Sequence, residues 1–137
     1  MDRIWRYLVE REHTCCFTGH RPNKLPWGSN EGDPRCLALK ERLAREVEAA
    51  YDKGYRHFIS GMALGCDLYF CEAVLNLRTC REGVTVEAAI PCEEQAARWQ
   101  EGDRRRYFAL VEQCDYETMV QHRYTRGCMQ RRHRYMV

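Results

Sequence analysis

Residues Ser60–Asp67 (SGMALGCD) are the part of the sequence whose residue types and spacing most clearly indicate chemistry. They follow a short apolar run and precede a helical pattern, so a turn containing glycines is expected to join a strand to a helix. Gly61 would let a ligand approach the backbone, and unpaired N–H groups at the helix start favour an anion. The alternative is that the glycines only shape the turn. The residues predicted to bind a phosphate-type ligand here are Ser60, Gly61, Met62, Gly65 and Asp67.

Two acidic residues lie in or shortly after this turn in the sequence. Asp67 lies in the first turn of the expected helix, and Glu72 follows about one and a half turns later. Either carboxylate could bind a ribose hydroxyl or polarise a water. An acid at the position of Asp67 is favoured by the helix dipole alone, so we do not predict that it is a base. Glu72 is a candidate general acid or base, and the alternative is a solvated glutamate.

The segment Thr18–Pro22 (TGHRP) follows the first apolar run of the domain and should reach the same end of the sheet as the glycine turn. Thr18 and the backbone around Gly19 can donate hydrogen bonds, and Arg21 can bind a phosphate through two N–H groups. His20 can act as an acid or base near neutral pH. The alternative is a surface or capping histidine. We predict that all four residues bind the ligand and that His20 is a second catalytic candidate.

The third loop of interest follows the apolar run that ends at Pro91. Gln95 can read the edge of a base or sugar, and Trp99 can stack on a ring, although a tryptophan at this helical spacing also fits the core. Cys92 lies next to an expected helix start, which lowers a thiol pKa. No histidine and orienting residue are arranged to activate it, so thiol catalysis is not predicted.

The order of the expected elements indicates an α/β protein with a Rossmann-like, three-layer fold and a mostly parallel sheet covered on both faces. In such sheets the loops at the carboxyl ends of the strands bind ligands. In one helix, Tyr107, Phe108 and Val111 are expected to point inward. Strands are predicted at 14–17, 57–60, 84–90 and 116–121. Helices are predicted from Asp33-Pro34, Gly65, Glu93 and Asp103, and over 127–137.

The boundaries of the chain suggest one domain with a short extension. Residues 1–13 are expected to form a helical N-terminal extension, and residues 14–137 form the domain. The last expected helix would ordinarily lead to a further strand. The chain is therefore either naturally short or a fragment that lacks the last strand of the fold.

Charge and cysteine content limit the function classes. The chain has 22 Lys and Arg against 20 Asp and Glu, a net charge of +2, which argues against a general nucleic-acid coat protein. A local patch of arginines between positions 123 and 134 remains. The nine cysteines include no C-x-x-C pair and no close Cys/His cluster, so neither a metal site nor a disulfide framework is predicted. Reduced thiols indicate the cytoplasm, and no apolar stretch is long enough for a membrane span.

The three loops together resemble one known family. Phe17–Pro22, Ile59–Asp67 and Ile90-Pro91, followed by Gln95 and Trp99, are similar to the YpsA-like branch of the SLOG superfamily, and the resemblance covers about residues 14–137. It implies a Rossmann-like domain that binds nucleotides, nucleotide-derived molecules or nucleic acid at the glycine turn. The superfamily includes the DNA-processing protein DprA and the LOG phosphoribohydrolases. The resemblance implies no particular reaction for the YpsA-like branch.

The sequence departs from its relatives in two places. The catalytic Pro-Gly-Gly-x-Gly-Thr-x-x-Glu loop of the LOG enzymes is absent, which weakens a prediction of nucleotide hydrolysis. Where relatives have Arg-Asn, this chain has Arg132 followed by His133; Arg132 matches and is expected near the ligand phosphate. Relatives also continue into a last strand and helix.

Three functions follow, in decreasing order of support. The first is binding or sensing of a nucleotide-derived small molecule whose identity the sequence leaves open. The second is an enzyme that cleaves an N-glycosidic or phosphate bond with Glu72 or His20 as the acid or base. The third is single-stranded nucleic-acid binding through the arginines between 123 and 134. Homo-oligomerisation is left open, and no membrane partner is predicted.

Overall fold

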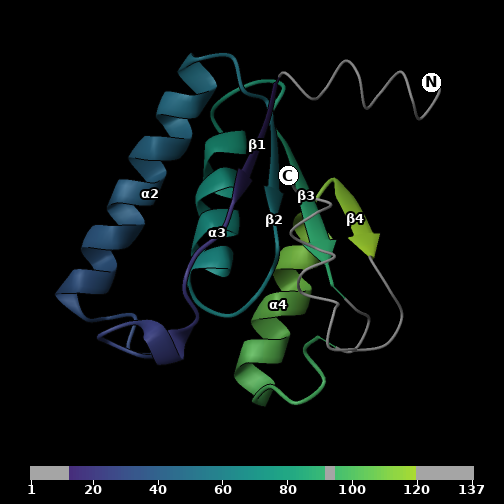
Figure 1. Ribbon diagram of the computed structural model, residues 1–137. Coiled ribbons are helices and arrows are strands. Elements are labelled where there is room, and N and C mark those ends of the chain that lie inside the picture. Colours follow the sequence, from purple (N-terminus) through teal and green to yellow (C-terminus); the bar gives the residue numbers. More distant parts are fainter. Residues whose placement is uncertain (1–12, 92–94, 120–137) are drawn as a thin grey trace.

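The computed structural model describes residues 13–91 and 95–119 (Figure 1). Strands and helices alternate along this part of the chain, as the sequence predicts. The predictions for residues 1–12, Cys92, Glu93, Glu94, and the helix over 127–137 lie outside it. The elements are β1 (Thr14–Phe17), the short 3-10 helix η2 (Pro22–Lys24), α2 (Pro34–Asp52), β2 (His57–Ser60), α3 (Cys66–Arg78), β3 (Thr85–Ile90), α4 (Glu101–Gln113) and β4 (Tyr116–Met119).

The four strands form one sheet in the order β1-β2-β3-β4, and every neighbouring pair is parallel. Thr14 pairs with His57, His57 with Thr85, and Glu87 with Tyr116. The carboxyl ends of all four strands therefore meet at one end of the sheet, called here the carboxyl end. This confirms the predicted α/β, Rossmann-like class with a parallel sheet.

The core lies between the sheet and the helices. Phe58 on β2 and Val86 on β3 occupy the same face of the sheet and pack in one cluster with Val47 of α2, Leu68 of α3 and Leu110 of α4. On the opposite face, Ile59 and Ala89 are also buried and contact each other. Burial on both faces is what a three-layer arrangement requires.

Local sequence explains where α2 begins and ends. Asp33 has an extended backbone and accepts a hydrogen bond from the N–H of Arg35 at 2.8 Å, and Pro34 occupies the first helical position. Both features are favoured at helix starts. The helix ends at Asp52, and Gly54 follows with a φ of +105°. The predicted cap and the predicted stop are both confirmed.

Helix α4 corrects two predictions. It begins at Glu101 rather than at Asp103, which lies in its first turn. Tyr107 is buried as predicted, but Phe108 is 59% exposed. Adjacent helical residues point about 100° apart, so Phe108 cannot share the inward face with Tyr107 and Leu110. None of the helices within residues 13–91 and 95–119 has the length and apolar character needed to cross a membrane.

Candidate functional site

The turn between β2 and α3 is held by its own polar side chains. Ser60 is fully buried, and its hydroxyl donates to the backbone oxygen of Asp67 at 2.9 Å while accepting the N–H of Met62 at 3.2 Å. The Asp67 carboxylate accepts the N–H of Ala63 at 3.3 Å. Sequence reasoning assigned Ser60 and Asp67 to the ligand. The structure places both inside the turn, where they fix its shape.

Met62 has an unusual backbone in this turn. Its φ is +58°, the one positive value for a residue other than glycine in the described part of the chain. A residue with a side chain in this region costs on the order of 1–3 kcal/mol and is held there by its surroundings. The Met62 side chain is fully buried, so burial and the hydrogen bond to Ser60 hold the conformation. Strained backbone of this kind concentrates at functional sites.

The loop after β1 packs directly against the start of α3. The N–H of Cys66 donates to the backbone oxygen of His20 at 3.1 Å. Gly65 has a φ of +90°, and a Cβ at this position would lie 2.7 Å from the same oxygen. A Cβ on Gly19 would lie 2.5 Å from the Cβ of Cys66. The two glycine motifs are therefore in backbone contact, as predicted for His20 and the glycine turn.

The accessible residues of this region come from the loop after β1. Thr18, His20 and Arg21 are exposed, whereas Ser60–Ala63 and Gly65–Asp67 are buried. Arg21 immediately precedes η2, and its backbone is extended. The exposed hydroxyl, imidazole and guanidinium thus stand next to the N-terminus of α3, a combination suited to an anionic ligand.

Gln95 joins the third loop to the glycine turn. Its side-chain amide donates to the backbone oxygen of Met62 at 3.1 Å. The three predicted loops therefore converge at the carboxyl end of the sheet. Trp99 is partly buried against the core and meets Tyr107 edge to face at 5.2 Å, in agreement with the alternative that it is a core residue.

Glu72 lies apart from this turn. It is five residues beyond Asp67 on α3, which corresponds to about 140° around the helix axis. Arg106 of α4 holds its carboxylate through Nε at 2.8 Å and through a second, very short contact from Nη2. The same guanidinium donates to Glu31 at 2.5 and 2.9 Å. Glu72 is therefore an ion-pair partner that joins α3, α4 and the loop before α2.

The charges in this cluster reinforce one another. Lys40 of α2 adds a 2.7 Å contact to Glu31. Burial raises the pKa of Glu31, but hydrogen bonds from Arg106 and Lys40 outweigh it and leave the pKa below its ordinary value. Burial likewise opposes the charge on Arg106, and its hydrogen bonds to Glu31 and Glu72 raise its pKa above the ordinary value. The sequence prediction missed Glu31, Lys40 and Arg106, because they are far apart along the chain.

A second polar cluster, also missed from the sequence, lies on the opposite face of the sheet. His57 and Glu87 are buried, with Nε2 and Oε1 2.8 Å apart. Nδ1 of His57 is 2.7 Å from the hydroxyl of Thr85, and the hydroxyl of Thr118 donates to Glu87 at 3.0 Å. The cluster ties β2, β3 and β4 together. Both imidazole nitrogens have partners, so its arrangement is that of a structural link.

The remaining candidates for chemistry at this site are thiols and metal ligands. Burial raises the pKa of the Cys66 thiol, which works against its use as a nucleophile at the start of α3. Within residues 13–91 and 95–119, no three His, Cys, Asp or Glu side chains come together as a metal site would need. Arg132, the remaining predicted ligand contact, lies outside the described residues.

The comparisons with known proteins agree with the motifs. The family model described as the YspA SLOG family matches residues 15–137. The UPF0398 protein YpsA of Bacillus subtilis is 29% identical over 108 residues, which cover 78% of this chain and 59% of the relative. A UPF0398 protein of Halalkalibacterium halodurans is 26% identical over 94 residues, covering 69% and 50%. One of Bacillus velezensis is 27% identical over 107 residues, covering 77% and 58%. The chain thus spans between 50% and 59% of the length of these relatives.

Proposed function

The chain belongs to the YspA SLOG family, and from that premise we propose that it binds a nucleotide-derived ligand at the carboxyl end of its sheet. The phosphate group of the ligand is assigned to the exposed side of the loop Thr18–Arg21, next to the N-terminus of α3. The proposed role is binding or sensing, in the cytoplasm, with no reaction assigned.

One observation carries this proposal: the backbone contact between the two glycine motifs. The Cβ positions of Gly19 and Gly65 would collide with Cys66 and with the oxygen of His20, at 2.5 and 2.7 Å. Such close packing puts the exposed side chain of Arg21 within the same small region as the start of a 13-residue helix. The positive end of the helix dipole and a guanidinium both stabilise a phosphate.

The roles proposed for the site residues follow from their exposure. Thr18, His20 and Arg21 are exposed and are assigned to direct ligand contact, together with the exposed backbone of Gly19. Gly61 and Gly65 are buried and are assigned to the shape of the turn. Ser60, Met62, Asp67 and Gln95 are assigned to holding the glycine turn in shape, because the hydrogen bonds described above join them within the turn or, for Gln95, to its Met62.

Hydrolysis of an N-glycosidic or phosphate bond has less support. Such a reaction needs an acid or base that can exchange a proton with the substrate. Glu72 is engaged by Arg106, which leaves His20 as the accessible catalytic candidate. Nucleic-acid binding depends on arginines between 123 and 134, which lie outside the described residues. Binding of a small nucleotide-type ligand is therefore the function we put forward.

The test is a thermal-shift measurement with nucleotides, NAD, ADP-ribose and short single-stranded DNA on the wild-type chain and two variants. Ligand that binds only the folded state raises the melting temperature. We expect a shift with at least one nucleotide-type compound, and its loss in Arg21→Ala. Arg105→Ala is the matched control, because the Arg105 side chain is 76% exposed and pairs with Glu101 of the same helix. Equal shifts in both variants, or none with any compound on the wild-type chain, would remove the proposal.

A further inference from the structure

Two free thiols from different helices meet inside the protein. Sγ of Cys71, on α3, lies 3.9 Å from Sγ of Cys114, the residue that caps the end of α4. The two residues are 43 positions apart in the sequence. Cys71 is fully buried in the main core cluster, and the half-buried Cys114 packs against that cluster. The packing of α3 against α4 therefore brings the two sulfur atoms together.

The hydrogen bonds of this pair give the two thiols different roles. The S–H of Cys114 donates to the backbone oxygen of Leu110, one turn back in α4, at 3.3 Å. A thiol carries a single proton, so Cys71 is the donor between the two sulfur atoms. Its S–H can still donate to Cys114 after Cys114 has lost its own proton.

The more accessible thiol is also the one whose surroundings favour the thiolate. The hydrogen bond from Cys71 outweighs the opposing effect of burial and lowers the pKa of Cys114 below its ordinary value. Among the charged neighbours, Arg78 lowers this pKa further, while Asp115 and Glu117 oppose it. The same hydrogen bond, together with burial, raises the pKa of Cys71. Cys114 is therefore the nucleophile of the pair, and Cys71 is its neutral partner.

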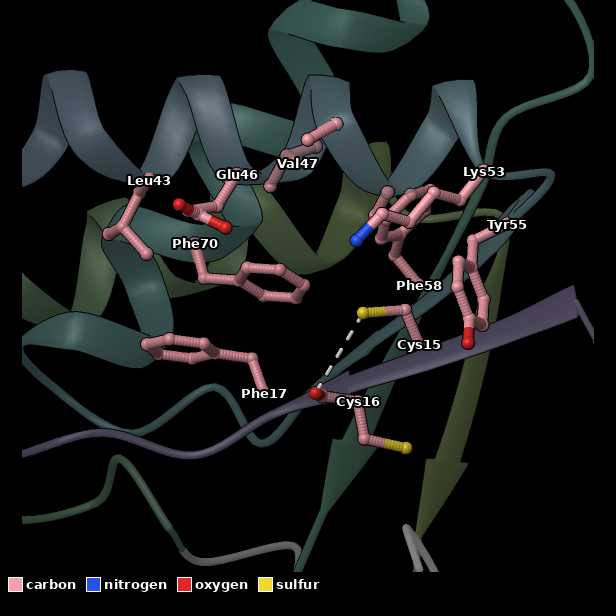
Figure 2. A pocket seen from close by; sticks show the side chains of 12 residues that line it. Cys15, Cys16, Phe17, Leu43, Glu46, Val47, Lys53, Tyr55, Phe58 and Phe70 are labelled. Atoms are coloured by element: carbon pink, nitrogen blue, oxygen red, sulfur yellow. Dashed lines mark hydrogen bonds between the residues drawn. The ribbon is translucent and has the colours of Figure 1, made fainter.

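The neighbouring cysteines on β1 lack this geometry. Cys15 and Cys16 follow each other along the strand, and Figure 2 shows their sulfur atoms on opposite sides of it. Alternating sides are the rule for a strand, so these two thiols do not face each other. Burial also raises the pKa of both. A redox-sensitive pair needs one reactive, accessible thiol beside a second thiol, and Cys114 with Cys71 meets this condition.

We propose that Cys71 and Cys114 form a redox modification site, in which a hydroperoxide converts the two thiols into one intramolecular disulfide that a dithiol reductant opens again. The Cys114 thiolate attacks one peroxide oxygen: an S–O bond forms, the O–O bond breaks, and the other oxygen takes up a proton and leaves as an alcohol or water. The sulfur of Cys71 then attacks the sulfenic acid: an S–S bond forms, the S–O bond breaks, and hydroxide leaves as water with the proton of Cys71. The two thiols lose two electrons, and the peroxide gains them.

The position of Cys114 at a helix end allows the bond to close. The sulfur atoms must approach from 3.9 Å to about 2.0 Å. Cys71 lies within α3, where helical hydrogen bonds hold the backbone, whereas Cys114 has an extended backbone at the end of α4. We therefore expect Cys114 to make most of the movement. The disulfide would link α3 covalently to the junction between α4 and β4.

Peptide mapping tests the bond on the wild-type chain. The reduced protein is treated with a small excess of hydrogen peroxide, its remaining thiols are blocked with N-ethylmaleimide, and it is digested without reductant. We expect a cross-linked peptide pair that contains Cys71 and Cys114, the loss of two of the nine thiols, and the recovery of both after dithiothreitol. Cys80→Ser, a change at an exposed thiol, is the matched control and should give the same cross-link. Thiol oxidation without a bond between Cys71 and Cys114, or with bonds spread over unrelated cysteines, overturns the proposal.

A second experiment tests the order of the two steps. In Cys71→Ala the sulfenic acid has no thiol to attack it, so it should accumulate on Cys114 and be labelled there by dimedone. In Cys114→Ala the oxidation of Cys71 should be roughly tenfold slower or more, because the fully buried thiol carries little thiolate. Oxidation of Cys71 at the wild-type rate in this variant overturns the role of Cys114 as the nucleophile. Circular dichroism checks that both variants fold, and the mapping of the wild-type chain decides the existence of the bond without them.

Discussion

The backbone oxygen of His20 accepts a hydrogen bond from the N–H of Cys66 at 3.1 Å, which joins the loop after β1 to the first residue of α3. The two segments are far apart in the sequence. Their contact depends on the absence of a side chain at Gly65, where a Cβ would lie 2.7 Å from that oxygen. The shape of the candidate site is therefore tied to one glycine.

Replacing this glycine should destabilise the fold. Gly65→Ala introduces both a positive φ of +90° and a contact with backbone, and we expect the free energy of unfolding to fall by about 2 kcal/mol or more. Urea denaturation measures the loss. Gly102→Ala on α4 is the matched control, because a Cβ there meets nothing within 4 Å. It should be neutral or stabilising by up to about 1 kcal/mol. If the two variants were equally stable, the contact would not have the role assigned to it.

The backbone of Met62 leads to a second prediction. Leucine at this position keeps a side chain of similar volume, and Met62→Leu should cost less than about 1.5 kcal/mol. Valine is branched at Cβ and tolerates a positive φ poorly. With a φ of +58° at this position, Met62→Val should cost on the order of 2 kcal/mol more than Met62→Leu. Thermal and urea unfolding of the two variants give the comparison. A valine variant as stable as the leucine variant would show that this turn adopts another backbone conformation in solution.

Arg106 should determine part of the acid sensitivity of the protein. Hydrogen bonds from Arg106 and Lys40 outweigh burial and keep the pKa of Glu31 below its ordinary value. A lowered folded-state pKa stabilises the protein above the unfolded pKa, and this contribution is lost as pH falls through the folded value. We therefore expect wild-type stability to decline as pH drops below about 4.3, the ordinary glutamate value.

The contribution of Arg106 to stability at different pH values can be measured with the variant Arg106→Met. At neutral pH the variant should be less stable by about 1–3 kcal/mol, because Glu31 and Glu72 lose a shared partner. The difference from wild type should shrink on acidification, since protonated Glu31 no longer forms an ion pair with the guanidinium. Urea unfolding at a series of pH values measures both. Arg105→Met, an exposed change on the same helix, should show neither effect. A difference that stays constant down to the acid limit would contradict the assignment.

The fold could be predicted from the sequence because its determinants are local. Apolar runs at residues 14–17 and 57–60, and the Asp33-Pro34 cap, each act within a few residues, and the strands and helices that they predict are present. The failure at Phe108 is also local: an aromatic residue next to Tyr107 was expected inside, but the helical period places it outward, 59% exposed. Helical geometry decides burial there, and residue type does not.

The candidate site could be predicted only in part. The convergence of its three loops follows from parallel strands, since their carboxyl ends must meet. The internal roles of Ser60 and Asp67 do not follow, because a hydroxyl and a carboxylate can serve a ligand or their own backbone equally well. The position of Glu72 depends on Arg106, which a sequence separation of 34 residues hides. Side-chain partners between separate helices require the packed structure.

The pair His57 and Glu87 provides the last prediction. Both residues are buried, at 5% and 4% exposure, and His57 Nε2 lies 2.8 Å from Glu87 Oε1 between β2 and β3. Removing one partner leaves the other buried with fewer hydrogen bonds, which costs about 1–3 kcal/mol. We expect His57→Ala and Glu87→Ala each to destabilise the protein by at least this amount. The double variant should be more stable than the sum of the two losses predicts, with a coupling of about 1–3 kcal/mol.

Urea unfolding of the single and double variants gives a double-mutant cycle. Repeating the cycle with Glu112→Ala, a change at an exposed residue, in place of Glu87→Ala separates the effect of the His57–Glu87 link from that of side-chain loss in general. The control pair should be additive within about 0.5 kcal/mol. Thr118 also donates to Glu87, at 3.0 Å, so Thr118→Val should destabilise the wild type more than it destabilises Glu87→Ala. Additivity between His57 and Glu87 would mean that strand pairing alone holds β2 to β3, and that this buried cluster does not stabilise the sheet.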